Sequence, residues 1–187
     1  MRWKLFTEML RKFRAGAPLG DVALMKIVAL DYKPAPAVKE QLGDLEGYFP
    51  KTDMPVLRTL PDGSLGREYA RFLDAQGIEP FVFSADIKQR FAKETHAIRY
   101  LVTHDLHHML GGFDAGLAGE AGVLAFTVGQ KTFGSVPLLM LQLFLGMLLS
   151  PTNMFRLWKN VRRGYKMGKG AKLLIGERIE EQYERPL

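Results

Sequence analysis

The sequence predicts an all-α fold, a single-domain multi-helix bundle of 187 residues. A chain of this length is expected to form one domain, which should bury roughly 70% of its unfolded surface. Helix-compatible stretches separated by proline and glycine make up most of the chain. The one strand-like run, Phe81-Val82-Phe83, is too short and too isolated to form a sheet. We therefore expect a single helical domain over residues 1–187, with no internal repeat.

Residues 1–14 form an N-terminal amphipathic helix that is both basic and aromatic. Its apolar residues are Trp3, Leu5, Phe6, Met9, Leu10 and Phe13, and its basic residues are Arg2, Lys4, Arg11, Lys12 and Arg14. Such a helix can lie in a membrane interface or pack on the domain. Glu8 and the lack of serine argue against a transit-type leader.

Capping and breaking residues mark the elements that follow. Asp21 can cap a helix that runs to about Leu30, and Pro34 and Pro36 break it. A further helix begins near Ala37, and residues 50–61 read as a loop.

Another helix should begin at Ser64 and end at Gly77, with Asp62 and Ser64 as candidate N-caps. Six more helices are expected, at about 85–93, 95–110, 115–131, 137–149, 152–166 and 170–184.

All four histidines of the chain lie within the helix expected at 95–110. His104 and His108 are four residues apart, so both imidazoles can point at one ion. Asp105, three residues before His108, can join from the side. His107 lies on the other side of the helix, and His96 is two turns away, so we expect neither to be a ligand.

Glu120 completes the set if the chain reverses direction between it and the histidines. On one straight helix, Glu120 would lie roughly 24 Å along the axis from His104. Gly111-Gly112 permits the left-handed turn that ends a helix. The sequence therefore predicts a metal cradle built as helix, Gly-Gly turn and helix, with His104, Asp105, His108 and Glu120 as ligands.

Two imidazoles and two carboxylates suit zinc, iron or manganese better than copper(I) or calcium. We take zinc as the first candidate, with iron, manganese or magnesium as alternatives. The chain has no cysteine, which excludes thiolate ligands and disulfides and fits a reducing cytosol. Four ligands would close a tetrahedral zinc site, whereas catalysis needs an open position.

The net charge of +6 and the pI near 9.5 favour acidic partners. No basic motif with interleaved glycine and aromatic residues is present, so nucleic acid is not expected as a partner. Anionic membrane lipid is the other acidic partner. We expect a cytoplasmic protein that is peripheral at the inner face of the membrane.

Residues 137–149 are the most apolar segment of the chain. A membrane-spanning helix needs about 20 residues, so this segment is too short to cross a membrane. It can be a buried core helix, the face of a homodimer or a wall for a lipid. Met140, Phe144 and Met147 could line an isoprenoid chain, because methionine adapts to irregular apolar shapes.

The pattern His104-Asp105-x-x-His108, eleven residues, then Glu120 resembles the signature of the Coq-four family of coenzyme Q (ubiquinone) biosynthesis proteins. Three further segments are similar to the family's: Leu60-Pro61-Asp62-Gly63-Ser64-Leu65-Gly66 with Tyr69 and Phe72-Leu73, Arg99-Tyr100, and Leu117-Ala118-Gly119-Glu120. The similarity covers about residues 20–185. Leu101-Val102 departs from the pattern of eukaryotic members, and Ile179-Glu180 stands where many members have Trp-Glu. With no mitochondrial leader seen, we expect a divergent bacterial member.

The resemblance implies zinc or another divalent ion and a ring substrate with a polyprenyl tail. The implied activity is metal-dependent oxidative decarboxylation, in which a hydroxyl replaces the ring carboxylate. Arg67, Arg99 or Lys131, which lie near the motifs, could pair with an anionic head group. The family also resembles a non-catalytic scaffold that organises other quinone biosynthesis enzymes at a membrane, and both alternatives stay open.

Two other metal-dependent classes fit the residues less well. A His-Asp phosphohydrolase needs a further histidine and aspartate on separate helices, whereas His96 shares the helix of His104, and Asp114 is in the wrong place. A di-iron bundle needs paired Glu-x-x-His helices, and the sequence has none.

Overall fold

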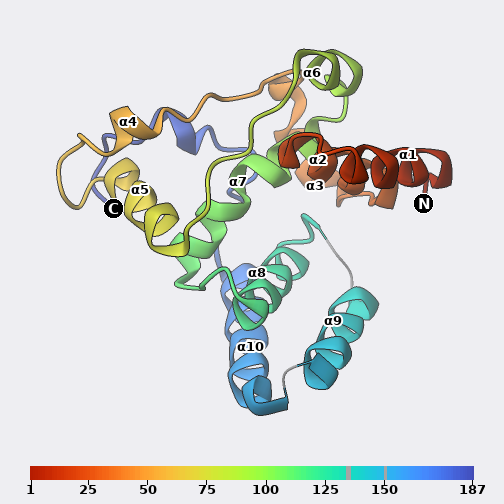
Figure 1. The fold of residues 1–187 in the computed structure, drawn as a ribbon. Coiled ribbons are helices and arrows are strands. Elements are labelled where there is room, and N and C mark those ends of the chain that lie inside the picture. The colour runs from red at the N-terminus through yellow and green to blue at the C-terminus, as the bar shows by residue number, and fades with distance from the viewer. Residues whose placement is uncertain (134–135, 150) are drawn as a thin grey trace.

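The computed structural model describes residues 1–133, 136–149 and 151–187 (Figure 1). Side chains inside these ranges that are not described are those of Val136, Leu138, Gln142, Met147, Leu149 and Pro151. The α-helices are α1 Trp3–Arg14, α2 Leu19–Leu30, α3 Pro36–Gln41, α4 Met54–Leu57, α5 Leu65–Gln76, α6 Ala85–Phe91, α7 Thr95–Gly111, α8 Leu117–Gly129, α9 Val136–Leu149 and α10 Met154–Gly170. Short 3-10 helices span Gly43–Leu45, Pro151–Asn153 and Ile179–Glu181. Strands are absent from the described residues apart from one isolated bridge, so the predicted all-α class is confirmed.

Helix α7 is the centre of the fold (Figure 1). Helices α2, α5 and α8 all contact it, while α1 packs on α2, and α10 runs along α8. The larger hydrophobic core lies among α2, α7 and α8, and a smaller core joins α5 to the C-terminal segment. Because neighbours surround α7, its polar residues are buried as well as its apolar ones.

Both ends of α5 form as the sequence predicts. The Ser64 hydroxyl accepts a hydrogen bond from the Arg67 backbone N–H at 3.3 Å and caps the first turn. Gly77 ends the helix in the left-handed conformation, with φ of 64°. The alternative cap, Asp62, instead pairs with the guanidinium of Arg71.

Asp21 does not cap α2, contrary to the prediction. The helix begins at Leu19 after Pro18, and Asp21 lies buried in its first turn. Its carboxylate accepts hydrogen bonds from the backbone N–H and the hydroxyl of Ser84, at 2.9 and 2.6 Å. A buried carboxylate needs such donors, so Asp21 fastens the start of α6 to α2.

The predicted helix over residues 170–184 is also wrong. After Gly170 the described chain is irregular except for the 3-10 turn at Ile179–Glu181. The side chain of Arg99 takes the carbonyls of Ile175 and Glu177, which a helix would need for its own hydrogen bonds. A smaller difference is α4, which forms inside the expected loop over residues 50–61 and is capped by Asp53.

Helices α8 and α10 approach closely because glycine lies at their crossing. A Cβ atom at Gly164 would stand 2.1 Å from the carbonyl oxygen of Gly122, and one at Gly168 would stand 2.1 Å from that of Phe126. Only hydrogen fits between these backbones, so the two glycines set the distance between the helices.

We expect Gly164→Ala to destabilise the protein by about 1–3 kcal/mol, the usual cost of overpacking. Gly170→Ala is the matched control, because nothing lies within 4 Å of a Cβ at that end of the same helix. Urea unfolding followed by circular dichroism measures both changes. Equal shifts in the two variants would show that the crossing tolerates a methyl group.

Helix α9 forms over the apolar segment that the sequence marks out, but most of its described side chains are not buried. Met140, Leu141, Phe144, Leu145 and Leu148 are exposed, and Leu139 is buried. The core-helix alternative therefore does not hold for this face of α9. Within the described residues, no helix combines the length and the apolar character needed to cross a membrane.

Candidate metal centre

The chain reverses direction at the glycine pair between α7 and α8 (Figure 1). Gly112 follows α7 with φ of 61°, a left-handed conformation that glycine adopts without strain. The Phe113 N–H donates to the carbonyl of His108 at 2.8 Å, which closes the end of α7. Helix α8 then begins at Leu117, and Glu120 lies in its first turn beside the last two turns of α7.

The structure brings the side chains of His104, His108 and Glu120 together. His104 Nε2 lies 3.5 Å from Glu120 Oε2, and His108 Nε2 lies 3.3 Å from Glu120 Oε1. One nitrogen from each histidine and one oxygen from the glutamate lie within 4.8 Å of one another. Three such atoms at this spacing can face a single ion.

The far side of each imidazole ring has its own hydrogen-bond partner. His104 Nδ1–H donates to Asp105 Oδ1 at 3.2 Å, and His108 Nδ1–H donates to the Asp114 carbonyl at 2.9 Å. These contacts turn the Nε2 atoms of both rings toward Glu120. Histidines that bind metals are oriented in the same way, by a carboxylate or a carbonyl on the other nitrogen.

One buried nitrogen atom of the cluster also favours a divalent cation. His108 Nε2 is buried and makes no hydrogen bond: because Nδ1 carries the proton given to the Asp114 carbonyl, Nε2 is an acceptor, and the Glu120 Oε1 atom 3.3 Å away is an acceptor too. A buried polar atom without a partner costs about 1–3 kcal/mol, and an ion bound between the histidines and Glu120 would remove that cost.

The charges of this cluster depend on one another. Burial disfavours a charged His104, but its hydrogen bonds to Asp105 and Glu120 outweigh burial and raise its pKa to about 9. Burial also disfavours a charged Glu120, but the two histidines outweigh it and hold the pKa of this carboxyl far below its usual range. Glu120 is therefore an anion at neutral pH, as a ligand should be.

Asp105 lies behind His104 and outside the group of three converging ligand atoms. The structure therefore gives it the place of an orienting partner. His107 is buried against Phe126, and both of its ring nitrogens lack partners. Burial lowers the pKa of His107 to about 3, so it is neutral.

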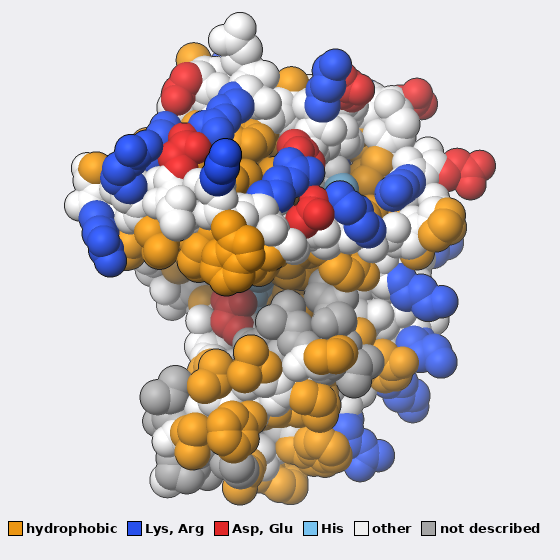
Figure 2. All heavy atoms as spheres, turned by 90° about the vertical axis from the view of Figure 1, so that its right-hand side faces the viewer, with side chains coloured by type: hydrophobic (Ala, Val, Ile, Leu, Met, Phe, Trp, Pro, Cys, Tyr) orange, Lys and Arg blue, Asp and Glu red, His pale blue; other side chains and the backbone are white. Residues whose placement is uncertain are grey.

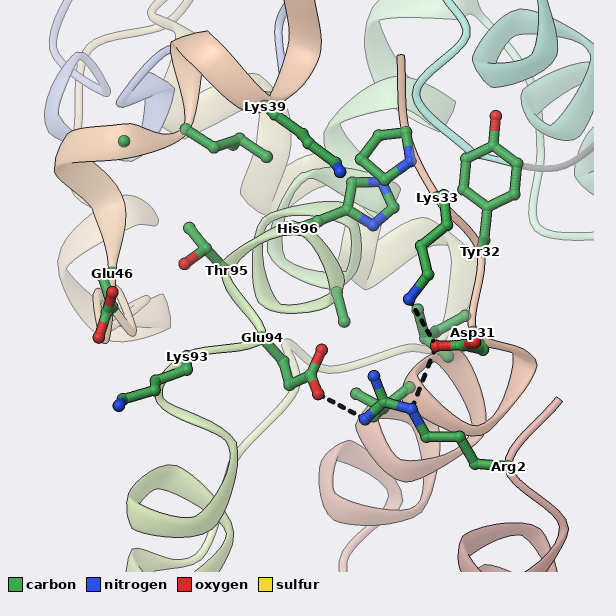
Figure 3. Close-up of a pocket in the computed structure, with 16 residues that line it drawn as sticks. Arg2, Asp31, Tyr32, Lys33, Lys39, Glu46, Lys93, Glu94, Thr95 and His96 are labelled. Carbon is green, nitrogen blue, oxygen red and sulfur yellow. Dashed lines mark hydrogen bonds and ion pairs between the residues drawn. The ribbon is translucent and has the colours of Figure 1, made fainter. Parts of the chain in front are cut away.

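His96 lies away from the cluster, at the N-terminal end of α7. Its Nε2–H donates to the carbonyl of Thr132. It lines a separate cavity of about 330 Å³, shown in Figure 3. In that cavity Arg2 pairs with both Asp31 and Glu94, and Lys33 also pairs with Asp31.

The three basic residues expected near the head group do not line the cavities beside the histidines. Arg99 is fully buried and binds Glu180 and the two backbone carbonyls described above. Arg67 pairs with Asp62, and Lys131 is an exposed residue with φ of 58° after α8. Arg99 thus holds the C-terminal segment in place.

Met140 and Phe144, which the sequence suggested as lining for an isoprenoid chain, are about half exposed on α9. They line neither of the two cavities that contain His104 and Glu120. The side chain of Met147 lies outside the described residues.

The cluster instead lies at the junction of two other cavities. Both contain His104, Glu120 and Phe81. One, of about 550 Å³, also contains Asp105, His108 and the start of α2. The other, of about 500 Å³, is mostly apolar, and its remaining residues are Ala23, Lys26, Ile27, Leu30, Tyr100, Leu101, Leu124 and Phe133.

Sequence reasoning missed Phe81 and Lys26 as residues of the site. Phe81 belongs to the extended segment between α5 and α6, and it reaches both cavities. The strand-like run Phe81-Val82-Phe83 could have indicated this role, because an apolar extended segment outside a sheet has to pack against other parts of the protein. Lys26 carries no signal of its own, since it is one exposed lysine on an apolar helix.

Comparisons with known proteins relate the chain to one family. The family model described as "Coenzyme Q (ubiquinone) biosynthesis protein Coq4" matches residues 49–187. The mitochondrial ubiquinone biosynthesis protein COQ4 homolog of Xenopus laevis is 32% identical over 138 residues, 71% of this chain and 47% of that protein. The corresponding protein of Talaromyces stipitatus is 32% identical over 136 residues, 71% of this chain and 46% of its own length. The chain spans about half the length of these relatives.

A solved structure has the same fold along almost the whole chain. It is a crystal structure of a "Putative ubiquinone biosynthesis protein" from Nostoc punctiforme, with a TM-score of 0.67 and 25% sequence identity. The match covers 99% of this chain and 91% of that one.

Proposed function

The chain belongs to the family of coenzyme Q (ubiquinone) biosynthesis proteins named Coq4, and from this premise we propose that it binds a divalent ion and a prenylated ring. The ion lies between His104, His108 and Glu120, with zinc as the first candidate. The ring is a biosynthetic intermediate that carries a polyprenyl tail, and the activity is oxidative decarboxylation of that ring.

The observation that carries this proposal is the place of the ligand cluster at the junction of two cavities. Both cavities are mostly apolar; the one beside Asp105 and His108 has room for a ring next to the ligands, and the one lined by Ile27, Leu101 and Leu124 suits a hydrocarbon tail. Phe81, which both cavities share, would pack where ring and tail meet. Lys26, exposed at the edge of the apolar cavity, could attract an anionic group.

The protein's own residues would orient and shield the ring. Asp105 and the Asp114 carbonyl orient the two imidazoles so that Nε2 of each faces Glu120, and the apolar lining would shield the ring from water. A divalent ion bound there would supply Lewis acidity toward a phenolate or carboxylate oxygen. The ring carbon loses CO₂ and gains a hydroxyl from water, a two-electron oxidation in which dioxygen can accept the two electrons and two protons and become hydrogen peroxide.

Turnover by the purified full chain tests the activity. We expect a 4-hydroxybenzoate with a short prenyl tail to give CO₂ and the hydroxylated ring in air, in the presence of the ion alone. Mass spectrometry of the extracted ring follows the loss of the carboxyl group and the gain of oxygen. An ion and a ring that bind without turnover would instead support the scaffold alternative, in which the protein presents the intermediate to other enzymes.

Ion binding should release protons in a pH-dependent way. With a pKa of about 9, His104 is charged at pH 7.5 in the ion-free protein and must become neutral to bind an ion. We therefore expect about one proton released per ion at pH 7.5, and an affinity that rises with pH up to the pKa of His104. Calorimetry in Tris and in HEPES separates the proton heat from the binding heat. Identical heats in both buffers would contradict a charged His104.

The same group sets a stability trend in the ion-free protein. Its folded pKa lies above the ordinary value of about 6.5, so its stabilising effect is complete below pH 6.5 and is lost as the pH rises through the folded pKa.

A further inference from the structure

Helix α1 has a second apolar stripe besides the one that packs on α2. Leu5 and Met9 are buried, whereas Trp3, Leu10 and Phe13 are 67%, 36% and 56% exposed. The spacing of seven and three residues places these three side chains on one face of the helix. Two of them are aromatic, and no other described element covers them.

Helix α9 presents a matching apolar face and carries no charged residue. Five exposed side chains recur along it at helical spacing, namely Met140, Leu141, Phe144, Leu145 and Leu148. Figure 1 places α1, α2 and α9 on the same side of the molecule. Figure 2, which faces that side, shows hydrophobic side chains gathered above and below a hollow. Exposed apolar surface on this scale is typical of an interaction site.

The cavity of about 500 Å³, which contains Glu120 and Lys26, reaches the surface beside these helices. Its wall on α2 consists of residues at helical spacing, and two of them, Lys26 and Leu30, are exposed. Helix α1 packs on this same α2, and Phe133 of the cavity comes three residues before α9 begins. The two apolar faces therefore flank the way into the cavity.

The charges beside the stripe of α1 are positive and lack partners. Lys4, Arg11 and Arg14 are exposed on the neighbouring face and form no ion pair within the described chain, and neither does Lys26. A second copy related by twofold symmetry would set such a basic face against itself. An anionic bilayer offers the opposite charge, and it also accepts exposed tryptophan and phenylalanine at its interface.

We propose that α1 and α9 together form one docking surface for an anionic lipid bilayer, with the cavity of Glu120 opening onto it. A lipid would then reach the cavity sideways from the bilayer. This entry route rests on the proposed function, whereas the docking surface does not. The interpretation also explains why the exposed side chains described on α9, Met140, Leu141, Phe144, Leu145 and Leu148, are all apolar.

Vesicle sedimentation of the full chain, without ion or substrate, tests the proposal. We expect binding to vesicles of phosphatidylcholine mixed with phosphatidylglycerol, and much weaker binding to phosphatidylcholine alone or at high salt. The double variant Phe13→Ser with Phe144→Ser should lower the partition coefficient about tenfold or more. Both side chains are more than half exposed, so the fold should tolerate the change.

The matched control is Val56→Ser with Leu187→Ser, which are 52% and 64% exposed. Helix α4 and the C-terminus lie on the opposite side of the molecule (Figure 1), so this variant should bind like the unchanged chain. Equal losses in both double variants, or no vesicle binding by the unchanged chain, would overturn the proposal. A dimer that the Phe13/Phe144 variant abolishes, without vesicle binding, would assign the surface to a second copy instead.

Glu120→Ala separates this proposal from the proposed function. The docking surface predicts that this variant still binds vesicles, whatever becomes of its ion and its turnover. Loss of vesicle binding in Glu120→Ala would overturn the docking surface.

Discussion

Replacing Glu120 by alanine is expected to lower the affinity for a divalent ion by more than the about 10–100-fold that loss of an outer partner costs. Glu120 supplies the carboxylate of the three converging ligand atoms, and its charge balances the imidazoles on α7. Without it, the ion would keep two neutral ligands and lose its anionic one. Calorimetry with zinc, and competition with a chromogenic chelator, measure the change.

Two further variants provide comparisons for the loss of ion affinity in Glu120→Ala. Asp105→Ala should cost about 10–100-fold, because Asp105 orients His104 from behind. Glu184→Ala removes an exposed carboxylate of the C-terminal segment and should leave the affinity unchanged. An effect of Asp105→Ala as large as that of Glu120→Ala would make Asp105 a direct ligand, as the sequence predicts. Unchanged affinity in Glu120→Ala would remove Glu120 from the site.

Breaking the ion pair between Arg99 and Glu180 is expected to cost about 3–5 kcal/mol of stability. The Arg99 side chain is 0% and that of Glu180 only 5% exposed, so either charge left alone would be buried without its partner. Arg99 also donates to the Ile175 and Glu177 carbonyls, at 3.1 and 2.6 Å. Arg99→Met should therefore loosen the whole C-terminal segment, and urea unfolding measures the loss.

The exposed pair Arg58 and Asp74 provides the control for this prediction. Both side chains are about half exposed, so Arg58→Ala should cost less than about 1 kcal/mol. The double variant Arg99→Met with Glu180→Leu should recover part of the loss, because it leaves no charge without a partner. If Arg99→Met weakened ligand binding without destabilising the fold, Arg99 would act at the head group instead.

The sequence predicts most helices because local signals decide where they begin and end. Ser64 and Gly77 bound α5 by a hydroxyl cap and a left-handed glycine, and both effects depend on only a few neighbouring residues. The histidine spacing and the glycine pair are equally local. They suffice to predict that Glu120 returns to His104 and His108.

The errors arise where a distant residue decides the local structure. Residues 170–184 have helical character, but Arg99 on α7 binds their carbonyls. Asp21 looks like a cap until Ser84, 63 residues later, supplies its hydrogen bonds. Neither contact can be read from residues close together in the sequence.

The basic residues expected at the head group lie outside the two cavities for a related reason. A charged residue beside a motif can serve the ligand or the fold, and only its burial and partners distinguish these roles. Arg99 turns out to hold the fold. Of the cavity residues, Phe81 lies in the strand-like run, which marks it only indirectly, and Lys26 comes from a segment without any motif.

Anomalous diffraction from crystals grown with zinc tests the central claim most directly. The account predicts one strong peak per chain at the zinc edge, within coordination distance, about 2.0–2.2 Å, of His104 Nε2, His108 Nε2 and a Glu120 carboxylate oxygen. A peak only at other residues, or none at these three although zinc is present, would contradict it.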